Sequence, residues 1–230
     1  VYKTRTQIFR ETCVMKRVIM SVLIISFIMG CANGSGMKVI IKPALDKRLK
    51  EIRPISLHAG LFIEPSLRQF KQDEWQKGLI EGVHHYVFPI GEPLATAIEE
   101  MTVLVFNRVT ILEKFPVREI IERENIDFVI TVNLKASELD LTVEESVWRA
   151  IGKHYLIVQI SILDRSLNKI FEEDLVVEGK SLDLIDFETE GGWWKISGPK
   201  YGPAVEDSIE KVVYKLAKRL IEIKDKLFSK

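Results

Sequence analysis

The chain has 230 residues, of which 47% are hydrophobic and 29% are charged, with 33 Lys and Arg against 33 Asp and Glu. This length is enough for one substantial domain with a buried core, and the composition excludes both a disordered chain and a membrane protein with many spans. The zero formal net charge argues against a general nucleic-acid binder, and two Cys are too few for a disulfide scaffold or a cysteine-built zinc site.

The first 30 residues carry a secretory signal pattern. They hold five Lys or Arg and one acid, which leaves 28 basic and 32 acidic side chains for the rest of the chain. Residues 15–30 begin with a Met-Lys-Arg triplet and continue as an apolar stretch in which only Ser21 and Ser26 are polar. Such a stretch of about 12 residues is typical of a signal peptide and is shorter than the roughly 20 residues that span a bilayer.

The cleavage site resembles the lipobox of bacterial lipoproteins. It has aliphatic Ile28 at −3, small Gly30 at −1 and the required Cys31 at +1, while Met29 departs from the commonest residues at −2. The resemblance implies that Cys31 receives a diacylglyceryl thioether, that the signal peptide is removed before it, and that its amino group is acylated, for example with palmitate. Two or three acyl chains hold a protein stably on a membrane. Ala32 at +2 would favour the outer membrane, so we expect an outer-membrane lipoprotein that faces the periplasm.

Other features of this end define the domain boundaries. The first 14 residues fit neither a signal nor a fold, and a chain that opens on Val suggests an alternative start codon, so we expect Met15 to be the true start. Residues 31–54 are then a lipid-anchored linker with a flexible Gly/Ser tether, and residues 55–230 form the periplasmic domain. The alternative is that Cys31 lies inside an N-terminal membrane helix with basic flanks.

The first half of this domain predicts alternating strands and helices, from runs of apolar residues and from apolar spacings of three and four. The expected elements are a buried strand at 55–63, a polar loop at 66–85, a helix opening at 91–93 and running to about 105, a short strand at 109–112, a short helix at 116–125 and an apolar strand at 126–134.

The second half predicts an antiparallel meander with one wetter face, because apolar and polar residues alternate along it. The expected elements are strands at 139–143, 154–163 and 170–178, a turn at 164–168, a long connection at 181–203 and an amphipathic helix from about 204 to 228. A coiled coil is the alternative for that helix, but three heptads favour a helix packed on the sheet.

Together these elements predict a single α/β sandwich with a mixed sheet, an antiparallel meander, helices mainly on one face and a long C-terminal helix. From Ile55 to Phe228, the element order, including the strand Asp-Phe-Val-Ile-Thr-Val at 127–132, resembles a known periplasmic α/β domain. That domain is shared by the TolB N-terminal domain, the penicillin-binding-protein activator lipoproteins and the curli-secretion lipoprotein.

Catalytic and metal-binding patterns are weak. His84 and His85 are adjacent and would point to opposite faces of a strand, while His58 and His154 are isolated in strands, so we expect no metal site and no cofactor. The chain has no Gly-x-Ser-x-Gly elbow and no Gly-rich phosphate loop. Clustered acids leave a carboxylate pair possible, and they lie at 144–145, 172–174 and 183–188.

Aromatic residues on the long connection are the candidate contact residues. Trp193 and Trp194 follow two glycines, and Tyr201 lies between two prolines. Aromatic side chains in such a position can stack on sugar rings or fill a partner's pocket. The alternative is that one Trp closes the end of the core. The polar loop with Trp75 is a lesser candidate.

The sequence therefore predicts a lipid-anchored, non-enzymatic envelope protein that binds another envelope component, either a transport or assembly protein or peptidoglycan. The anchor would raise its effective concentration near a partner at the membrane. One alternative is a lipid-anchored cell-wall glycan hydrolase that uses a carboxylate pair. Another is a multimeric secretion subunit with a membrane hairpin, which the acids at 172–174 disfavour. The oligomeric state stays open.

Overall fold

The computed structural model describes residues 36–77, 83–144, 149–184, 187–190, 193–196 and 201–224. All of them except Gly36 belong to one compact unit, Met37–Lys230. The predicted signal peptide and Cys31 lie outside the described residues, so the lipobox remains a prediction. No helix in the described part of the chain is long and apolar enough to cross a membrane.

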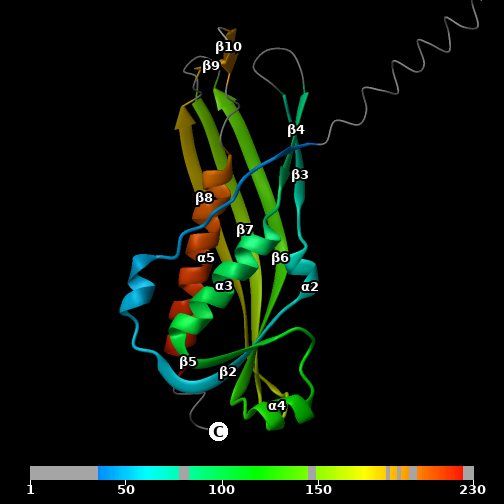
Figure 1. Ribbon diagram of the computed structural model, residues 1–230, viewed down its shortest axis with the longest axis vertical. Coiled ribbons are helices and arrows are strands. Elements are labelled where there is room, and N and C mark those ends of the chain that lie inside the picture. The colour runs from blue at the N-terminus through cyan, green and yellow to red at the C-terminus, as the bar shows by residue number, and fades with distance from the viewer. Residues whose placement is uncertain are drawn as a thin grey trace, which may run out of the picture. The chain divides into compact units, whose positions relative to one another are not determined.

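A five-stranded mixed sheet is the centre of the fold (Figure 1). The strand order is β5-β2-β6-β7-β8. β2 (Ile55–Ile63) is parallel to both β5 (Phe106–Leu112) and β6 (Phe128–Glu144). β7 (Arg149–Asp164) and β8 (Lys169–Leu184) extend the sheet from β6 as an antiparallel meander. The predicted α/β class with a mixed sheet and a meander is confirmed.

The remaining elements are short strands and helices around this sheet. β1, β4 and β3 form a small sheet in that order, and β9 pairs with β10. The elements are β1 (Met37–Lys38), η1 (Lys47–Glu51), α2 (Pro65–Arg68), β3 (Gln72–Lys77), β4 (Val83–Phe88), α3 (Gly91–Val105), α4 (Arg118–Glu124), β9 (Phe187–Glu190), β10 (Trp193–Ile196) and α5 (Gly202–Glu222).

The expected loop at 66–85 is wrong, because β3 and β4 form an antiparallel pair there. β4 buries Tyr86 and Phe88 in the main core, and β1 pairs with it on the other side. The apolar runs at 126–134 and 139–143 also form one strand, which continues through a register shift between Leu134 and Ala136. Pairing with distant segments therefore makes strands of residues whose own sequence pattern does not predict a strand.

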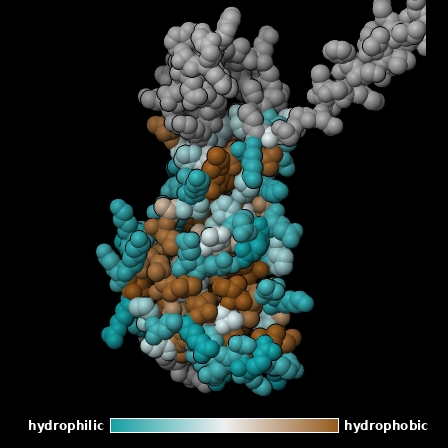
Figure 2. All heavy atoms as spheres, in the orientation of Figure 1, coloured by the Kyte–Doolittle hydropathy of each residue, from teal (hydrophilic) through white to brown (hydrophobic). Residues whose placement is uncertain are grey.

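α3 and α5 cover one face of the sheet. Alternate residues of its strands point to that face, and Ile130, Val158 and Ile160 are at most 1% exposed there. The stripe of α5 that includes Val205 and Ile209 completes the same apolar cluster. Figure 2 shows apolar side chains gathered over this side of the molecule with hydrophilic side chains around them.

The opposite face is only partly covered. Val129 on β6 and Leu163 on β7 point to it and join a smaller apolar cluster with Ile121 of α4. Farther along the same strands, the residues that share this face are polar and half-buried, as Thr131 and Gln159 illustrate. This is the wetter face that the alternation predicts.

α5 approaches the meander closely at two glycines. A Cβ on Gly179 would lie 2.1 Å from the Ala204 carbonyl oxygen and 2.5 Å from the Ser208 nitrogen. A Cβ on Gly152, in the neighbouring strand, would lie 3.1 Å from the Ala204 Cβ. Since the nearest atoms to Gly179 are backbone atoms, no side-chain rotation could make room for a larger residue there. The glycines allow the start of α5 to rest directly on the sheet.

The outer edge of β8 is paired by side chains of α5. A four-residue step on a helix spans about 6 Å and matches a two-residue step on a strand. Three hydrogen bonds of this kind join the Lys180 N–H to Asp207 Oδ2 (2.8 Å), Lys211 Nζ to the Glu178 carbonyl (3.0 Å) and Lys215 Nζ to the Val176 carbonyl (3.3 Å). They occupy backbone groups that an edge strand would otherwise offer to another chain.

Replacing Gly179 with Ala tests this close approach. The added methyl group must push α5 from the sheet, so we expect Gly179→Ala to lower the free energy of unfolding by about 2–3 kcal/mol in urea denaturation. Val176→Ala, on the exposed side of the same strand, is the matched control and should cost less than about 1 kcal/mol. Equal effects of the two substitutions would contradict the packing account.

Candidate functional site

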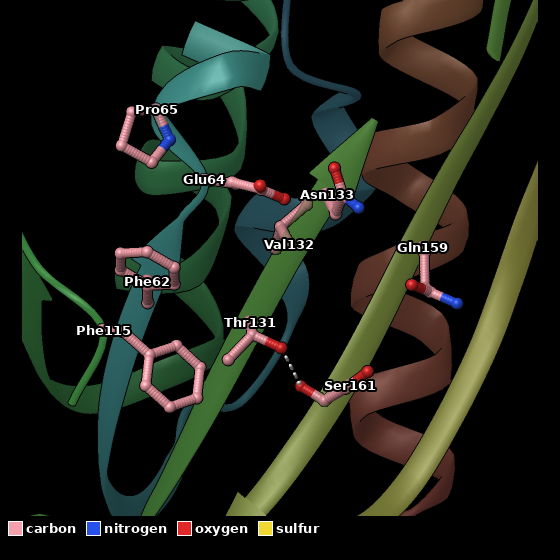
Figure 3. A pocket seen from close by; sticks show the side chains of 9 residues that line it. All are labelled: Phe62, Glu64, Pro65, Phe115, Thr131, Val132, Asn133, Gln159 and Ser161. Carbon is pink, nitrogen blue, oxygen red and sulfur yellow. Dashed lines mark hydrogen bonds between the residues drawn. The ribbon is translucent and has the colours of Figure 1, made fainter. Parts of the chain in front are cut away.

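A hollow of about 490 Å³ lies on the partly covered face of the sheet (Figure 3). Three parts of the fold contribute to it: the end of β2 with the start of α2, the connection after β5, and the first part of β6 beside the last part of β7. The lining residues are Phe62, Glu64, Pro65, Phe115, Thr131, Val132, Asn133, Gln159 and Ser161.

The floor of this pocket consists of two polar cross-strand pairs. Thr131 is the register partner of Ser161, and Asn133 is the register partner of Gln159. Residues two apart on a strand share a face, so both hydroxyls and both amides lie on the side that α3 and α5 do not cover. The antiparallel register of β6 and β7 therefore brings four polar side chains to one place.

Two phenylalanine rings form the wall beside β2. Phe62 and Phe115 pack edge to face, with ring centroids 5.6 Å apart and an interplanar angle of 84°. Phe62 also packs against the smaller apolar cluster, while Phe115 is 58% exposed. The pair thus joins a fixed ring on the sheet to a ring that a ligand can reach.

Several polar groups of the pocket are available to a ligand. In the part of the chain that the structure describes, the side chains of Glu64, Asn133 and Gln159 make no hydrogen bond or ion pair. The two hydroxyls are engaged: Thr131 Oγ1 donates to the Ser161 carbonyl, and Ser161 Oγ donates to Glu172, each at 3.3 Å. The pocket can therefore offer two amides and one carboxylate beside an aromatic wall.

The contact residues expected from the sequence lie elsewhere. Trp193 and Trp194 are on β10, where their backbones are register partners of Glu190 and Thr189, and their side chains lie outside the described part. Tyr201 is 1% exposed, and its ring packs edge to face against Tyr86 with centroids 5.6 Å apart. Burial raises the pKa of Tyr201. We therefore correct the expectation that Tyr201 is a surface contact, because it belongs to the core.

Sequence reasoning missed the pocket residues. The available signal was the pair of polar interruptions in otherwise apolar strands, Thr-Val-Asn at 131–133 and Gln-Ile-Ser at 159–161. Their proximity depends on the strand register, and the aromatic wall comes from segments far away in the chain.

Each described histidine contacts its own set of partners, and no two of them share a site. Among the described residues, no group of three His, Cys, Asp or Glu could hold a metal ion. The two imidazole nitrogens of His58 lie 3.0 Å from the Asn125 carbonyl and 2.8 Å from Thr110 Oγ1. His85 Nε2 lies 2.8 Å from Asp73 Oδ1. The His84 side chain lies outside the described part.

His154 is fully buried where α5 meets the meander. Its Nδ1 lies 2.5 Å from Ser208 Oγ, and its Nε2 lies 2.8 Å from Ser137 Oγ. Ser208 Oγ also lies 2.7 Å from the Val205 carbonyl oxygen, and Ser137 Oγ lies 2.7 Å from Gln72 Oε1. Because a neutral imidazole has a single N–H, one of the two hydroxyls donates to its other ring nitrogen. Burial lowers the pKa of His154 from 6.5 to about 4, so the imidazole is neutral at pH 7. Since Ser208 is 0% exposed, the His–Ser contact joins structural elements and does not present a nucleophile to a substrate.

No family model matches this chain, and no curated protein matches it. Among solved structures, a neuraminyllactose-binding hemagglutinin homolog from Helicobacter pylori is 13% identical at a TM-score of 0.40, with 76% of this chain and 93% of that chain covered. The hypothetical protein CT253 from Chlamydia trachomatis is 9% identical at a TM-score of 0.34, with 75% of this chain and 99% of that chain covered.

The buried imidazole makes stability depend on pH. Between pH 6.5 and pH 4, His154 is protonated in the unfolded chain and neutral in the folded chain. The free energy of unfolding therefore falls as the pH falls through this range. We expect a loss of about 2 kcal/mol between pH 7.5 and pH 5 in urea denaturation. His154→Gln should reduce this loss, and His85→Gln is the control at a less buried histidine. The same pH dependence in wild type and His154→Gln would refute the assignment.

Proposed function

We propose that this chain is a lipid-anchored protein of the cell envelope, on the periplasmic side of the outer membrane, that binds another envelope component without turning it over. The observation that carries the binding role is the pocket, where unpaired amides and a carboxylate meet an exposed aromatic ring on the sheet face that α3 and α5 leave open. The lipobox-like sequence that ends in Cys31 supports the location.

The chemistry of the pocket favours a peptidoglycan glycan strand over a protein partner. Asn133 and Gln159 can both donate to and accept from sugar hydroxyls and acetamido groups, and Glu64 can accept from hydroxyls. The rings of Phe62 and Phe115 offer the apolar surface on which a sugar face can rest. A hollow of about 490 Å³ also lies within the size range of small-ligand pockets, whereas protein interfaces are usually flat and larger.

The carboxylates of this region support binding over hydrolysis. A glycosidase needs two carboxyl groups across the scissile bond, one of them with a raised pKa. Among the described lining residues, Glu64 is the one carboxylate. Glu172 lies next to the pocket, but its Oε2 is 2.6 Å from Lys169 Nζ, and the hydrogen bond from Lys169 lowers the pKa of Glu172. A carboxyl group held in this way is a poor proton donor.

The binding role can be tested by sedimentation with purified peptidoglycan sacculi, using the full lipidated protein in detergent. We expect the wild-type protein to sediment with sacculi and Asn133→Ala/Gln159→Ala to bind at least about tenfold more weakly, because two hydrogen-bonding groups are lost. Asn107→Ala removes an exposed amide on β5, outside the pocket, and is the matched control.

Wild-type affinity in the double variant, or no sedimentation of the wild type, would contradict a pocket for peptidoglycan. The same incubation distinguishes the hydrolase alternative. Release of soluble glycan fragments that Glu64→Gln abolishes would contradict the non-enzymatic proposal.

A further inference from the structure

The small sheet fixes the point at which the chain enters the domain. In β1, Met37 is the register partner of Tyr86 and Lys38 that of Val87, and the Val39 N–H donates to the Val87 carbonyl at 2.9 Å. Because β1 is parallel to β4, the chain reaches Met37 from the side on which β4 begins. Met37, the first described residue of the domain, is therefore held beside Tyr86 in the middle of β4.

The predicted anchor is close to this point along the chain. Cys31 precedes Met37 by six residues, which span at most about 20 Å when fully extended. A lipid on Cys31 would therefore hold the bilayer surface within about 20 Å of Met37. The length of this tether limits which surfaces of the domain can reach the membrane.

Trp75 is exposed beside this point. It lies on β3 opposite His85, the neighbour of the residue that pairs with Met37. Trp75 is 66% exposed, yet its ring is stacked on the His85 ring with centroids 4.2 Å apart and an interplanar angle of 6°. Asp73, two residues before Trp75 on the same strand, lies 2.8 Å from His85 Nε2 through its Oδ1. The indole is thus presented by an ordered strand and oriented by its neighbours.

Other aromatic residues lie at the same end of the domain. β10, which contains Trp193 and Trp194, is drawn at the end where β1 and the β3–β4 hairpin lie (Figure 1). α5 follows β10, and its first residue is close to the entering chain, since a Cβ on Gly202 would lie 2.8 Å from the Ile40 carbonyl oxygen. β10 and the start of α5 therefore lie toward the end of the domain at which the chain enters through β1.

We propose that this end of the domain rests on the bilayer that holds the lipid of Cys31, with Trp75 as a second membrane contact. The proposal rests on the lipid anchor of the proposed function. An indole has an apolar body and a polar N–H, and it is favoured at the membrane–water interface. A rigidly held Trp within reach of the anchor would orient the domain on the membrane, where the lipid alone leaves it free to rotate.

The test uses the full lipidated chain with Trp75 as its sole tryptophan, made with Trp148→Phe, Trp193→Phe and Trp194→Phe. The protein is reconstituted into phosphatidylethanolamine and phosphatidylglycerol vesicles whose acyl chains carry bromine near the interface. We expect the bromines to quench Trp75 fluorescence by about half, because quenching requires contact with the interface. The matched control carries Trp75→Phe and Val117→Trp, which moves the indole to an exposed site next to α4, and should be quenched less than a fifth as much.

The possible results distinguish failure of the proposed orientation from failure of the proposed lipid anchor. Trp75 that stays unquenched in a chain shown by mass to be lipidated would overturn the orientation and leave the anchor intact. Equal quenching of the Trp75 and Val117→Trp chains would also overturn it. A blue shift of Trp75 emission without quenching would indicate contact with a second copy of the chain instead. Absence of lipid on Cys31 would overturn the proposed function itself.

Discussion

The close approach of α5 to the meander is the constraint on which the rest of the domain depends. Gly152 and Gly179 leave no side chain between the helix and the sheet, so the Ala204 and Ser208 backbones rest on the strands. At this distance α5 can pair the edge of β8 with its own side chains, and Ser208 can reach the buried His154. α5 thereby closes the edge of β8 and, together with α3, covers one side of the sheet.

Because α3 and α5 cover one face of the sheet, the opposite face is the one that a ligand can reach. α4 and its small cluster protect only part of that face, and the remaining strand positions carry hydroxyls, amides and acids that water can solvate. A polar group that is solvated without a protein partner costs little to keep, and it can exchange water for a ligand. The pocket of Asn133, Gln159 and the Phe62–Phe115 pair has this character. The fold therefore separates a dry face that supplies stability from a wet face available for recognition.

The sequence predicts the elements with strong local patterns and misses those that depend on distant contacts. The strand at 55–63 and the helix at 91–105 have the predicted bounds, because the apolar run of the strand and the apolar spacing of the helix are each complete within the segment. β3 is a polar run, Gln72–Lys77, whose strand conformation is supported by pairing with β4. For Tyr201 the local pattern is misleading. Its Pro and Gly neighbours suggest an exposed loop, but the ring is buried because α5 packs closely on the sheet. The pocket could not be derived, since its walls meet only through the register of β6 and β7 and the connection after β5.

The proposed binding role and the proposed orientation both depend on attachment of the domain to a membrane through Cys31. The most direct measurement is the intact mass of the protein recovered from membranes of an expressing bacterium, beside the Cys31→Ser variant. We predict a chain that begins at Cys31 and carries added acyl mass, with both the added mass and the membrane attachment lost in the variant. An unmodified chain that still carries residues 15–30 would contradict it and would make the apolar stretch a membrane helix.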